Sequence, residues 1–500
     1  MASQKSNLTI DHFGTEHLKK NLGGRAARGG LVAITAQALK FVITLGATAV
    51  MARLLTPQDY GFVGMVGVVT GFVATYKDLG LSAATIQSPK ITSDQISTLF
   101  WINVLLSIGI AVLTIGLAPF ISWFYGEPRL TWITILTGFG FIINGFAVQH
   151  EALLRRQMRY FALSTIGLVA MVVGYIIGIS MAWKGFSYFA LVGSQLAVAF
   201  TSTLITWAVV RWKPGPPKKG TGVRSMLKLG GNLTGFATIN YFARNGDNLL
   251  IGRFWGAEQV GIYSRAYQLM MLPIDQINEP VTTVAVPSLS RLVDSPEDYR
   301  RAYLRMIEKI AFLTMPSVAA MIVTSDWLVS IVLGPKWASV ATILQLLGAT
   351  ALIQPIANTT GWLFITQGRT DEMFKMSLWG GPITILSIIV GIPWGAVGVA
   401  TSYTIAHVCG TPILYWYIGR RGPVRAGDFY RRTVPLLGAT LFGMLMALAF
   451  RWWNPSIGKW VGIPVCVAIL LATFLISLLL LPSGRASLKD VAASFFLLRK

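Results

Sequence analysis

The chain has 500 residues, of which 54% are hydrophobic and 12% charged, and its formal net charge is +22. With a mean hydropathy of +0.60, this composition excludes a soluble multidomain protein and predicts an integral membrane protein. In a soluble protein the excess of Lys and Arg would indicate nucleic-acid binding. In a membrane protein it is typical of cytoplasmic loops, so we expect no nucleic-acid partner.

From the amino terminus, residues 1–30 are polar and contain five Lys or Arg, which predicts a cytoplasmic segment with no cleaved signal. Fourteen apolar runs follow, and each has about the 20 residues that one helical crossing of the bilayer needs. They lie at 31–51, 61–86, 97–119, 130–150, 160–181, 186–210, 226–251, 260–285, 303–325, 338–365, 374–392, 394–417, 433–452 and 460–481. The predicted fold is therefore all-α, with about fourteen transmembrane helices.

The distribution of Lys and Arg predicts the orientation of these helices. The segments on the amino-terminal side of the predicted membrane, with both termini and the adjoining span ends included, hold 31 of them, and the segments on the opposite side hold 7. Because positive residues accumulate on the cytoplasmic side, both termini are expected in the cytoplasm of a cell whose inner membrane holds the protein. The residues 482–500 repeat apolar positions at helical spacing among basic ones, which predicts a cytoplasmic tail with a helix on the inner leaflet.

The connections and the rare residue types predict no catalytic domain or cofactor. The longest connections are 211–225, a basic and Pro-rich stretch that we interpret as a flexible cytoplasmic linker, and 286–302. Neither is long enough to fold into a catalytic domain. Cys409 and Cys466 lie in separate apolar runs, and the histidines lack the spacing of ligands, so we expect no metal site. A phosphate-binding Gly-rich loop is missing from the sequence, which argues against ATP hydrolysis by the chain.

The sequence contains an internal repeat at an offset of 200 residues. Residues 53–61 align with 253–261, and Gly46 aligns with Gly246. Six predicted helices separate the copies, and an even number preserves orientation, so we expect two parallel lobes that face a central cavity. The predicted regions are an N-lobe at 31–210, the linker at 211–225, a C-lobe at 226–417, and two added helices within 433–481.

Charged and polar residues within the predicted spans are candidates for a substrate site, because a charge at mid-membrane is costly unless it faces water or a partner. Gln37, Lys40 and Thr44 follow helical spacing and form one polar stripe. The repeat partners of Lys40 and Thr44 are Asn240 and Arg244. We expect both stripes to face the central cavity.

Two further groups of polar residues follow in the second lobe. Asp247 comes one turn after Arg244, and we expect it to pair with that guanidinium or to couple transport to a cation. The next predicted helix carries Arg265 and Asp275 and is interrupted by prolines at 273, 280 and 287, which predict a hinge. Gly174 and Gly178 form a small-residue pair that favours close contact between helices.

The sequence resembles the Wzx-type polysaccharide flippases of the MOP superfamily, particularly the exopolysaccharide or colanic-acid-exporter branch. The segments that carry this resemblance are Arg53-Leu54-Leu55-Thr56-Pro57-Gln58-Asp59-Tyr60-Gly61, Asp78-Leu79-Gly80-Leu81-Ser82-Ala83-Ala84, Gln95-Ile96-Ser97-Thr98-Leu99-Phe100-Trp101-Ile102-Asn103, Leu153-Leu154-Arg155-Arg156-Gln157-Met158-Arg159 and Gly368-Arg369-Thr370. The resemblance implies two six-helix lobes plus two helices, and translocation of undecaprenyl-diphosphate-linked oligosaccharide. Relatives that flip the peptidoglycan precursor use arginines in their first, second and eighth helices. Here Lys40 takes the first place, the second helix has no mid-membrane Arg, and the eighth has Arg265.

The resemblance implies a lipid-linked oligosaccharide as substrate, membrane lipids as surroundings, and polysaccharide polymerase or export machinery as partners. Lys40, Arg244 and Arg265 could attract the anionic diphosphate. Two alternatives stay open. A MATE-type antiporter of small molecules would share the architecture but favour an anionic cavity. A membrane-embedded glycan polymerase would present a substantial outer loop, and every predicted outer connection here is short.

Overall fold

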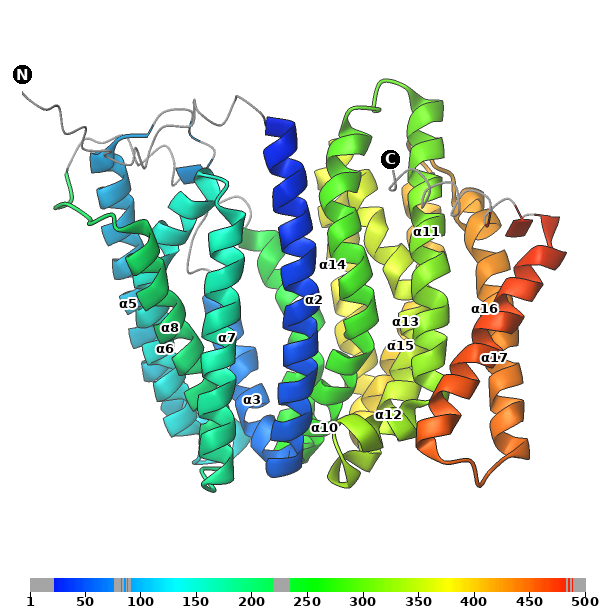
Figure 1. Cartoon of the computed structure of the whole chain (residues 1–500), viewed down its shortest axis with the longest axis horizontal. Helices are drawn as coiled ribbons and strands as arrows, with labels where there is room; N and C mark the ends of the chain where they lie inside the picture. Colours follow the sequence, from blue (N-terminus) through cyan, green and yellow to red (C-terminus); the bar gives the residue numbers. More distant parts are fainter. Residues whose placement is uncertain are drawn as a thin grey trace, which may run out of the picture. The chain divides into compact units, whose positions relative to one another are not determined.

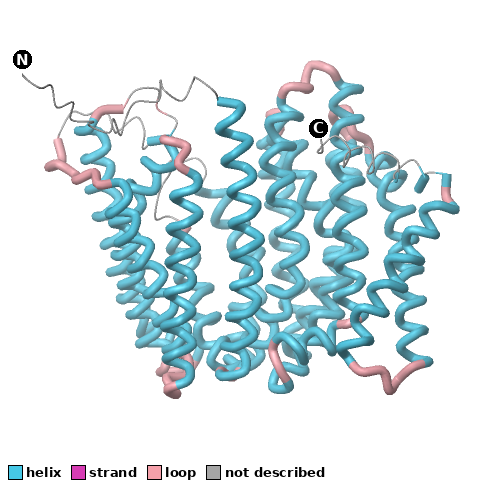
Figure 2. The backbone as a smooth tube through the Cα atoms, viewed as in Figure 1, coloured by secondary structure: helices cyan, strands magenta, loops and turns pink. Residues whose placement is uncertain are grey.

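The computed structural model describes residues 22–75, 91–218 and 234–482, together with 82, 85, 86, 88, 484, 485 and 488. Helices account for nearly all of this part of the chain, as Figure 2 shows, and the all-α prediction is confirmed. The helices are α2 (Leu22–Leu54), α3 (Pro57–Ala74), α5 (Ser93–Tyr125), α6 (Leu130–Arg156), α7 (Tyr160–Trp183), α8 (Phe189–Val210), α10 (Thr234–Ser290), α11 (Pro296–Val323), α12 (Ser325–Val332), α13 (Ala338–Thr366), α14 (Thr370–Gly391), α15 (Gly395–Gly419), α16 (Ala426–Trp453) and α17 (Lys459–Leu480).

The number of long helices agrees with the prediction once α10 is divided. Its backbone leaves the helical conformation at Gly256, where φ is 79° and ψ is −176°. With α10 counted as two and the short α12 left out, the described residues form fourteen long helices. Ten helical segments of this part of the chain are long and apolar enough to span a membrane, and one of them, Thr370–Gly419, holds two helices. The chain is a multi-pass membrane protein.

The division of α10 falls where the sequence predicts it. The predicted spans 226–251 and 260–285 leave residues 252–259 between them, and the described chain is helical throughout 234–290 except at Gly256, which lies in this interval. The backbone stays helical at the three prolines of this region, and the hinge expected there stays a prediction. A Gly takes up the change of direction because only a residue without a Cβ adopts this conformation at low cost.

The helices divide into two compact units, residues 1–241 and 242–500. In the first unit α5 packs along α6, α7 along α8, and α6 against α8, while α2 packs against α7 (Figure 1). The pair α7 and α8 approach closely, because a β-carbon at Gly174 would lie 2.3 Å from Val198 Cγ2 and 2.9 Å from the Ser194 carbonyl oxygen. The expected role of Gly174 in a helix contact is confirmed.

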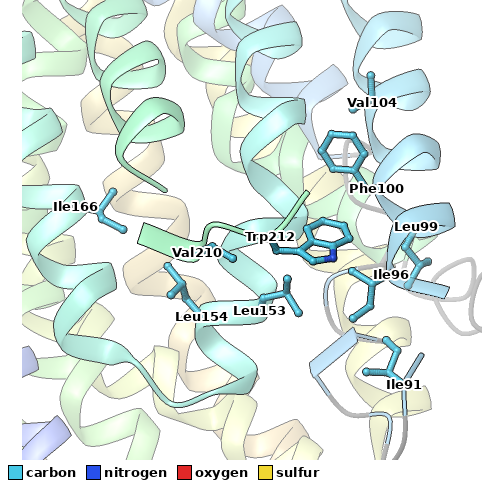
Figure 3. Close-up of a cluster of buried hydrophobic side chains, with 10 residues drawn as sticks. All are labelled: Ile91, Ile96, Leu99, Phe100, Val104, Leu153, Leu154, Ile166, Val210 and Trp212. Atoms are coloured by element: carbon cyan, nitrogen blue, oxygen red, sulfur yellow. The ribbon is translucent and has the colours of Figure 1, made fainter. Parts of the chain in front are cut away.

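A buried apolar cluster closes one end of the first unit. Figure 3 shows Phe100 of α5, Leu153 and Leu154 of α6 and Trp212 among its members. Trp212 follows α8 and begins the predicted linker, and its indole meets the Phe100 ring edge to face at 6.1 Å between centroids. The burial of Trp212 holds the start of the linker against the helices.

The described part of the linker is fixed to α5. The Gly215 amide donates to Ser97 Oγ at 3.0 Å, and the Trp101 indole donates to the Gly215 carbonyl at 2.9 Å. Lys218 pairs with Asp94 at 2.9 Å. The interpretation as a flexible linker is therefore wrong for 211–218. The rest of the predicted linker, residues 219–225, lies outside the described residues, as do residues 1–21 and most of the predicted tail helix at 482–500.

The second unit repeats the helix pairs of the first. There α11 packs against α13, α14 along α15, and α13 against α15, while α16 and α17 form an additional pair that α11 contacts. The turns repeat as well, at an offset of 210. Met158 between α6 and α7 has a φ of 53°, and Gly368 between α13 and α14 has a φ of 70°. The breaks after α2 and within α10 keep the offset of 200, at Thr56 and Gly256.

Candidate functional site

The polar stripe of α2 faces α7 over part of its length. Gln37 is exposed and Lys40 is half-buried. A β-carbon at Gly167 of α7 would lie 3.1 Å from Lys40 Nζ, so the glycine leaves room for the ammonium group. Thr44 Oγ1 lies 3.5 Å from Met171 Sδ, also in α7. The structure thus brings Lys40 and Thr44 together on one face of α2 and positions the Lys40 charge beside a small residue.

The corresponding stripe of α10 separates its two charges. Arg244 is exposed, whereas Asp247 is buried with 3% of its surface accessible. The Asp247 carboxylate accepts the Asn248 backbone amide at 2.7 Å. Among the described residues Asp247 forms no ion pair with Arg244. The expected ion pair between them is therefore wrong. The side chain of Asn240 lies outside the described residues.

Three tyrosines of the second unit lie within electrostatic range of the Asp247 carboxylate. They are Tyr263 and Tyr267 of α10 and Tyr403 of α15. Tyr267 also interacts with Arg244 and with Asp275, which is exposed. Arg265 is half-buried on the same half of α10. Tyr267 thus lies within electrostatic range of three predicted site residues, Arg244, Asp247 and Asp275.

These tyrosines were not predicted from the sequence, although one signal was present. Tyr263 and Tyr267 are four residues apart and therefore lie on one face of the helix. An acidic residue in an apolar segment needs polar neighbours, and a pair of hydroxyl groups at helical spacing supplies them. The tyrosines were passed over because their rings also suit an apolar core.

A cavity in the first unit, uncharged in its described lining, was also not predicted from the sequence. It has a volume of about 260 Å³ and lies between α3, α6 and α8. Its polar lining residues are Thr70, Thr137, Asn144 and Gln195. Such residues are common in membrane helices, so without charge they gave no signal in the sequence.

Several other charged side chains described in the second unit hold helix ends together. Arg432 of α16 pairs with the buried Glu308 of α11 at 2.9 Å. Glu372 at the start of α14 pairs with Arg369 at 2.7 Å and with Arg421 at 3.1 Å. In the sequence these Arg residues served only to predict the orientation of the helices in the membrane. The structure shows that they also stabilise the packing of the helices.

Comparison with known proteins gives a consistent set of similarities. A protein family described as "Polysaccharide biosynthesis protein" matches residues 50–342. The teichuronic acid biosynthesis protein TuaB of Bacillus subtilis is 28% identical over 75% of this chain and 79% of its own length. The lipopolysaccharide biosynthesis protein WzxC of Escherichia coli is 25% identical over 80% of this chain and 82% of its own.

Two solved structures share the fold. The lipid II flippase MurJ in an inward closed conformation has a TM-score of 0.69 at 14% identity, covering 89% of this chain and 97% of its own. An inward-facing multidrug transporter of the MATE family, in the MOP superfamily, has a TM-score of 0.58 at 16% identity, covering 75% and 93%. At these identities the similarity shows the fold alone, which confirms the predicted MOP-type architecture.

Proposed function

We propose, from the premise that the chain belongs to the polysaccharide biosynthesis protein family, that it is a flippase of lipid-linked oligosaccharides. The substrate would be an undecaprenyl-diphosphate-linked repeat unit for exopolysaccharide or lipopolysaccharide synthesis. Family membership over residues 50–342 is the observation that carries this proposal. The MATE-type fold does not favour drug transport, because the MurJ structure shares the same fold.

The chemistry of the substrate explains why a protein is needed. Moving even one charged side chain to mid-membrane costs about 2.5–3.5 kcal/mol, and a diphosphate with a polar glycan carries more charge and more hydrogen-bonding groups. A flippase gives these groups a polar path while the lipid tail stays in the bilayer. No covalent bond changes in this step, so the proposed function is transport and not catalysis.

We assign the charged residues roles that fit their positions. The Lys40 ammonium, with Gln37 and Thr44 on the same helix, would attract the diphosphate in the first unit. Arg244 and Arg265 would do so in the second unit, and Asn240 is a candidate for the polar lining of the path. Asp247 and Asp275, which both lie within electrostatic range of Tyr267, are the candidates for coupling transport to a proton or another cation.

The proposed cycle is alternating access between an inward-open and an outward-open state. The parts of the chain that we assign to this cycle are the lobes 31–210 and 226–417, the linker 211–225 and the added helices within 433–481. The proposed location is the bacterial inner membrane with both termini in the cytoplasm. There the protein would deliver substrate to polysaccharide polymerase or export machinery.

Deletion of the gene tests the proposal directly. Cells without the protein should accumulate a lipid-linked oligosaccharide that only reagents with access to the cytoplasmic leaflet can modify. Restoring the gene should move this lipid to the outer leaflet and restore the surface polysaccharide. Normal polysaccharide export in the deletion strain, with no accumulated lipid, would contradict the proposed function.

Substitution of the cations tests their role. Lys40→Ala and Arg244→Ala should each lower export by about tenfold, because a hydrogen bond to a charged group contributes about 1.5–3 kcal/mol. Export is measured at matched protein abundance in the membrane. Lys184→Ala is the control, since this lysine is exposed in the turn after α7. Wild-type export by both variants and by the double variant would rule out the assigned role.

A further inference from the structure

The uncharged cavity of the first unit is built for hydrogen bonding. Thr70 of α3 and Thr137 and Asn144 of α6 each donate to the backbone carbonyl four residues earlier, at 2.9, 2.8 and 2.9 Å. These bonds use a donor of each side chain and leave oxygen lone pairs available as acceptors. The Gln195 amide of α8 is exposed, and among the described residues it has no hydrogen-bond partner. It offers both donors and an acceptor.

The lining selects against an anion. Among the residues that the structure describes, none that lines the cavity is charged. A phosphate group is held most strongly by Arg, Lys or several backbone amides, and a ring of acceptor oxygens would repel it. Hydroxyl groups of a ligand, by contrast, can donate to Thr70, Thr137 and Asn144 and can also accept from Gln195.

The volume of the cavity and its apolar walls restrict the class of ligand further. A volume of about 260 Å³ is below the roughly 300–1,000 Å³ of sites for drug-sized molecules, so it suits a single small ring. Phe141, Leu196 and Val192 also line it. A sugar ring has hydroxyl groups at its rim and C–H groups on its faces, and this mixed surface matches a lining of amides, hydroxyls and an aromatic ring.

We propose that this cavity is a sugar subsite, which binds one uncharged sugar ring of the lipid-linked substrate while Lys40 of the same unit attracts its diphosphate. The inference rests on the proposed function and extends it. It assigns recognition of the glycan to α3, α6 and α8 of the first unit, separately from recognition of the anion. It also predicts that the protein distinguishes a glycosylated lipid diphosphate from a bare one.

Gly67 gives a sharp test because it lines the cavity, and a β-carbon there would meet no atom within 4 Å. Gly67→Leu should therefore fill the cavity without displacing a neighbour, and Gln195→Leu should remove its amide. Gly116→Leu is the matched control. Gly116 lies in α5, away from the cavity lining, and its β-carbon would also meet open space.

The measurement is binding of two lipids to the purified full-length protein in nanodiscs, by native mass spectrometry. The probes are undecaprenyl-diphosphate-linked N-acetylglucosamine and undecaprenyl diphosphate. Gly67→Leu and Gln195→Leu should each weaken binding of the glycolipid by about tenfold and leave the bare diphosphate within about twofold. Gly116→Leu should change neither affinity. Lys40→Ala should weaken the binding of both lipids.

The outcomes separate this inference from the proposed function. Equal binding of the two lipids by the wild-type protein, or unchanged glycolipid binding by both cavity variants, would overturn the sugar subsite and leave the flippase proposal standing. A wild-type protein that binds neither lipid would overturn both. Weakened binding of both lipids by Gly67→Leu, with the control unaffected, would show that the cavity does not distinguish the sugar, and would also reject the subsite.

Discussion

Arg155 and Arg156 are neighbours in the sequence, yet the structure places them in different surroundings. Arg155 is exposed, whereas Arg156 is buried with 5% of its surface accessible. The Arg156 guanidinium donates to the carbonyl oxygens of Thr85 at 2.9 Å and Ser88 at 2.6 Å. These bonds attach the segment before α5 to the end of α6. The second arginine of the motif at 153–159 is thus a structural residue.

Arg156→Ala should lower the free energy of unfolding by about 1–3 kcal/mol, because it leaves buried carbonyl oxygens without donors. The loss should appear as a lower midpoint of thermal denaturation for the detergent-solubilised protein, followed by size-exclusion chromatography. Arg155→Ala is the control and should shift stability by no more than about 0.5 kcal/mol. Equal midpoints for the two variants would show that the guanidinium bonds do not stabilise the fold.

At the same scale, the sequence predicts which residues share a face of a helix better than it predicts what that face contacts. Lys40 and Thr44 share a face of α2, as their spacing implied, because helical periodicity is fixed by the backbone. That spacing could not show that the face meets Gly167 of α7, since the packing of helices distant in sequence decides it. Arg244 and Asp247 also share helical spacing, but only the Asp247 carboxylate is buried, whereas Arg244 is exposed.

Individual helices were predicted closely where apolar runs have sharp ends and less closely where polar residues extend them. The expected run 160–181 became α7 at Tyr160–Trp183, whereas 97–119 became α5 at Ser93–Tyr125. The longer start of α5 comes from a capping box. Thr92 accepts the Gln95 amide at 3.2 Å, and Gln95 accepts the Thr92 amide at 2.9 Å. Hydropathy cannot detect such a start, because its residues are polar.

Contact between α7 and α8 depends on Gly174. A methyl group at this position would approach Val198 Cγ2 to 2.3 Å and the Ser194 carbonyl oxygen to 2.9 Å, and the backbone atom cannot move without shifting α8. Gly174→Ala should therefore cost about 1–3 kcal/mol of stability through overpacking. We expect a lower denaturation midpoint in the same chromatographic assay.

Gly116→Ala provides the comparison for Gly174→Ala, because both change a helical glycine of the first unit and the β-carbon at 116 meets open space. Alanine stabilises a helix relative to glycine by about 0.5–1 kcal/mol when it has room, so the control should be neutral or slightly stabilising. A Gly174→Ala protein as stable as this control would show that the two helices can separate without cost.

For the whole molecule, duplication explains more of the architecture than hydropathy does. The helix pairs of the first unit recur in the second, and the left-handed residues at 158 and 368 hold equivalent turns. In both turns the residue after the left-handed one donates its amide to a carbonyl five residues earlier, Arg159 to Leu154 at 2.9 Å and Arg369 to Phe364 at 2.8 Å. From the sequence, only the repeat of residues 53–61 at 253–261 could be detected. The turns at 158 and 368 are offset by 210 and share few identical residues.

The topology of the whole chain provides the last prediction. Fourteen crossings would place both ends of the chain on one side of the membrane, and the division of 31 against 7 Lys and Arg assigns that side to the cytoplasm. Reporter fusions after Lys213 and after Lys500 should therefore be active as cytoplasmic fusions, and a fusion after Lys184 as a periplasmic one. Lys184 and Lys213 are suitable sites because both lie in described connections, one on each side of α8. A cytoplasmic signal at Lys184, or opposite signals at Lys213 and Lys500, would mean that one long helix does not cross. The parallel relation of the two repeats would then fail as well, since it depends on an even number of crossings between them.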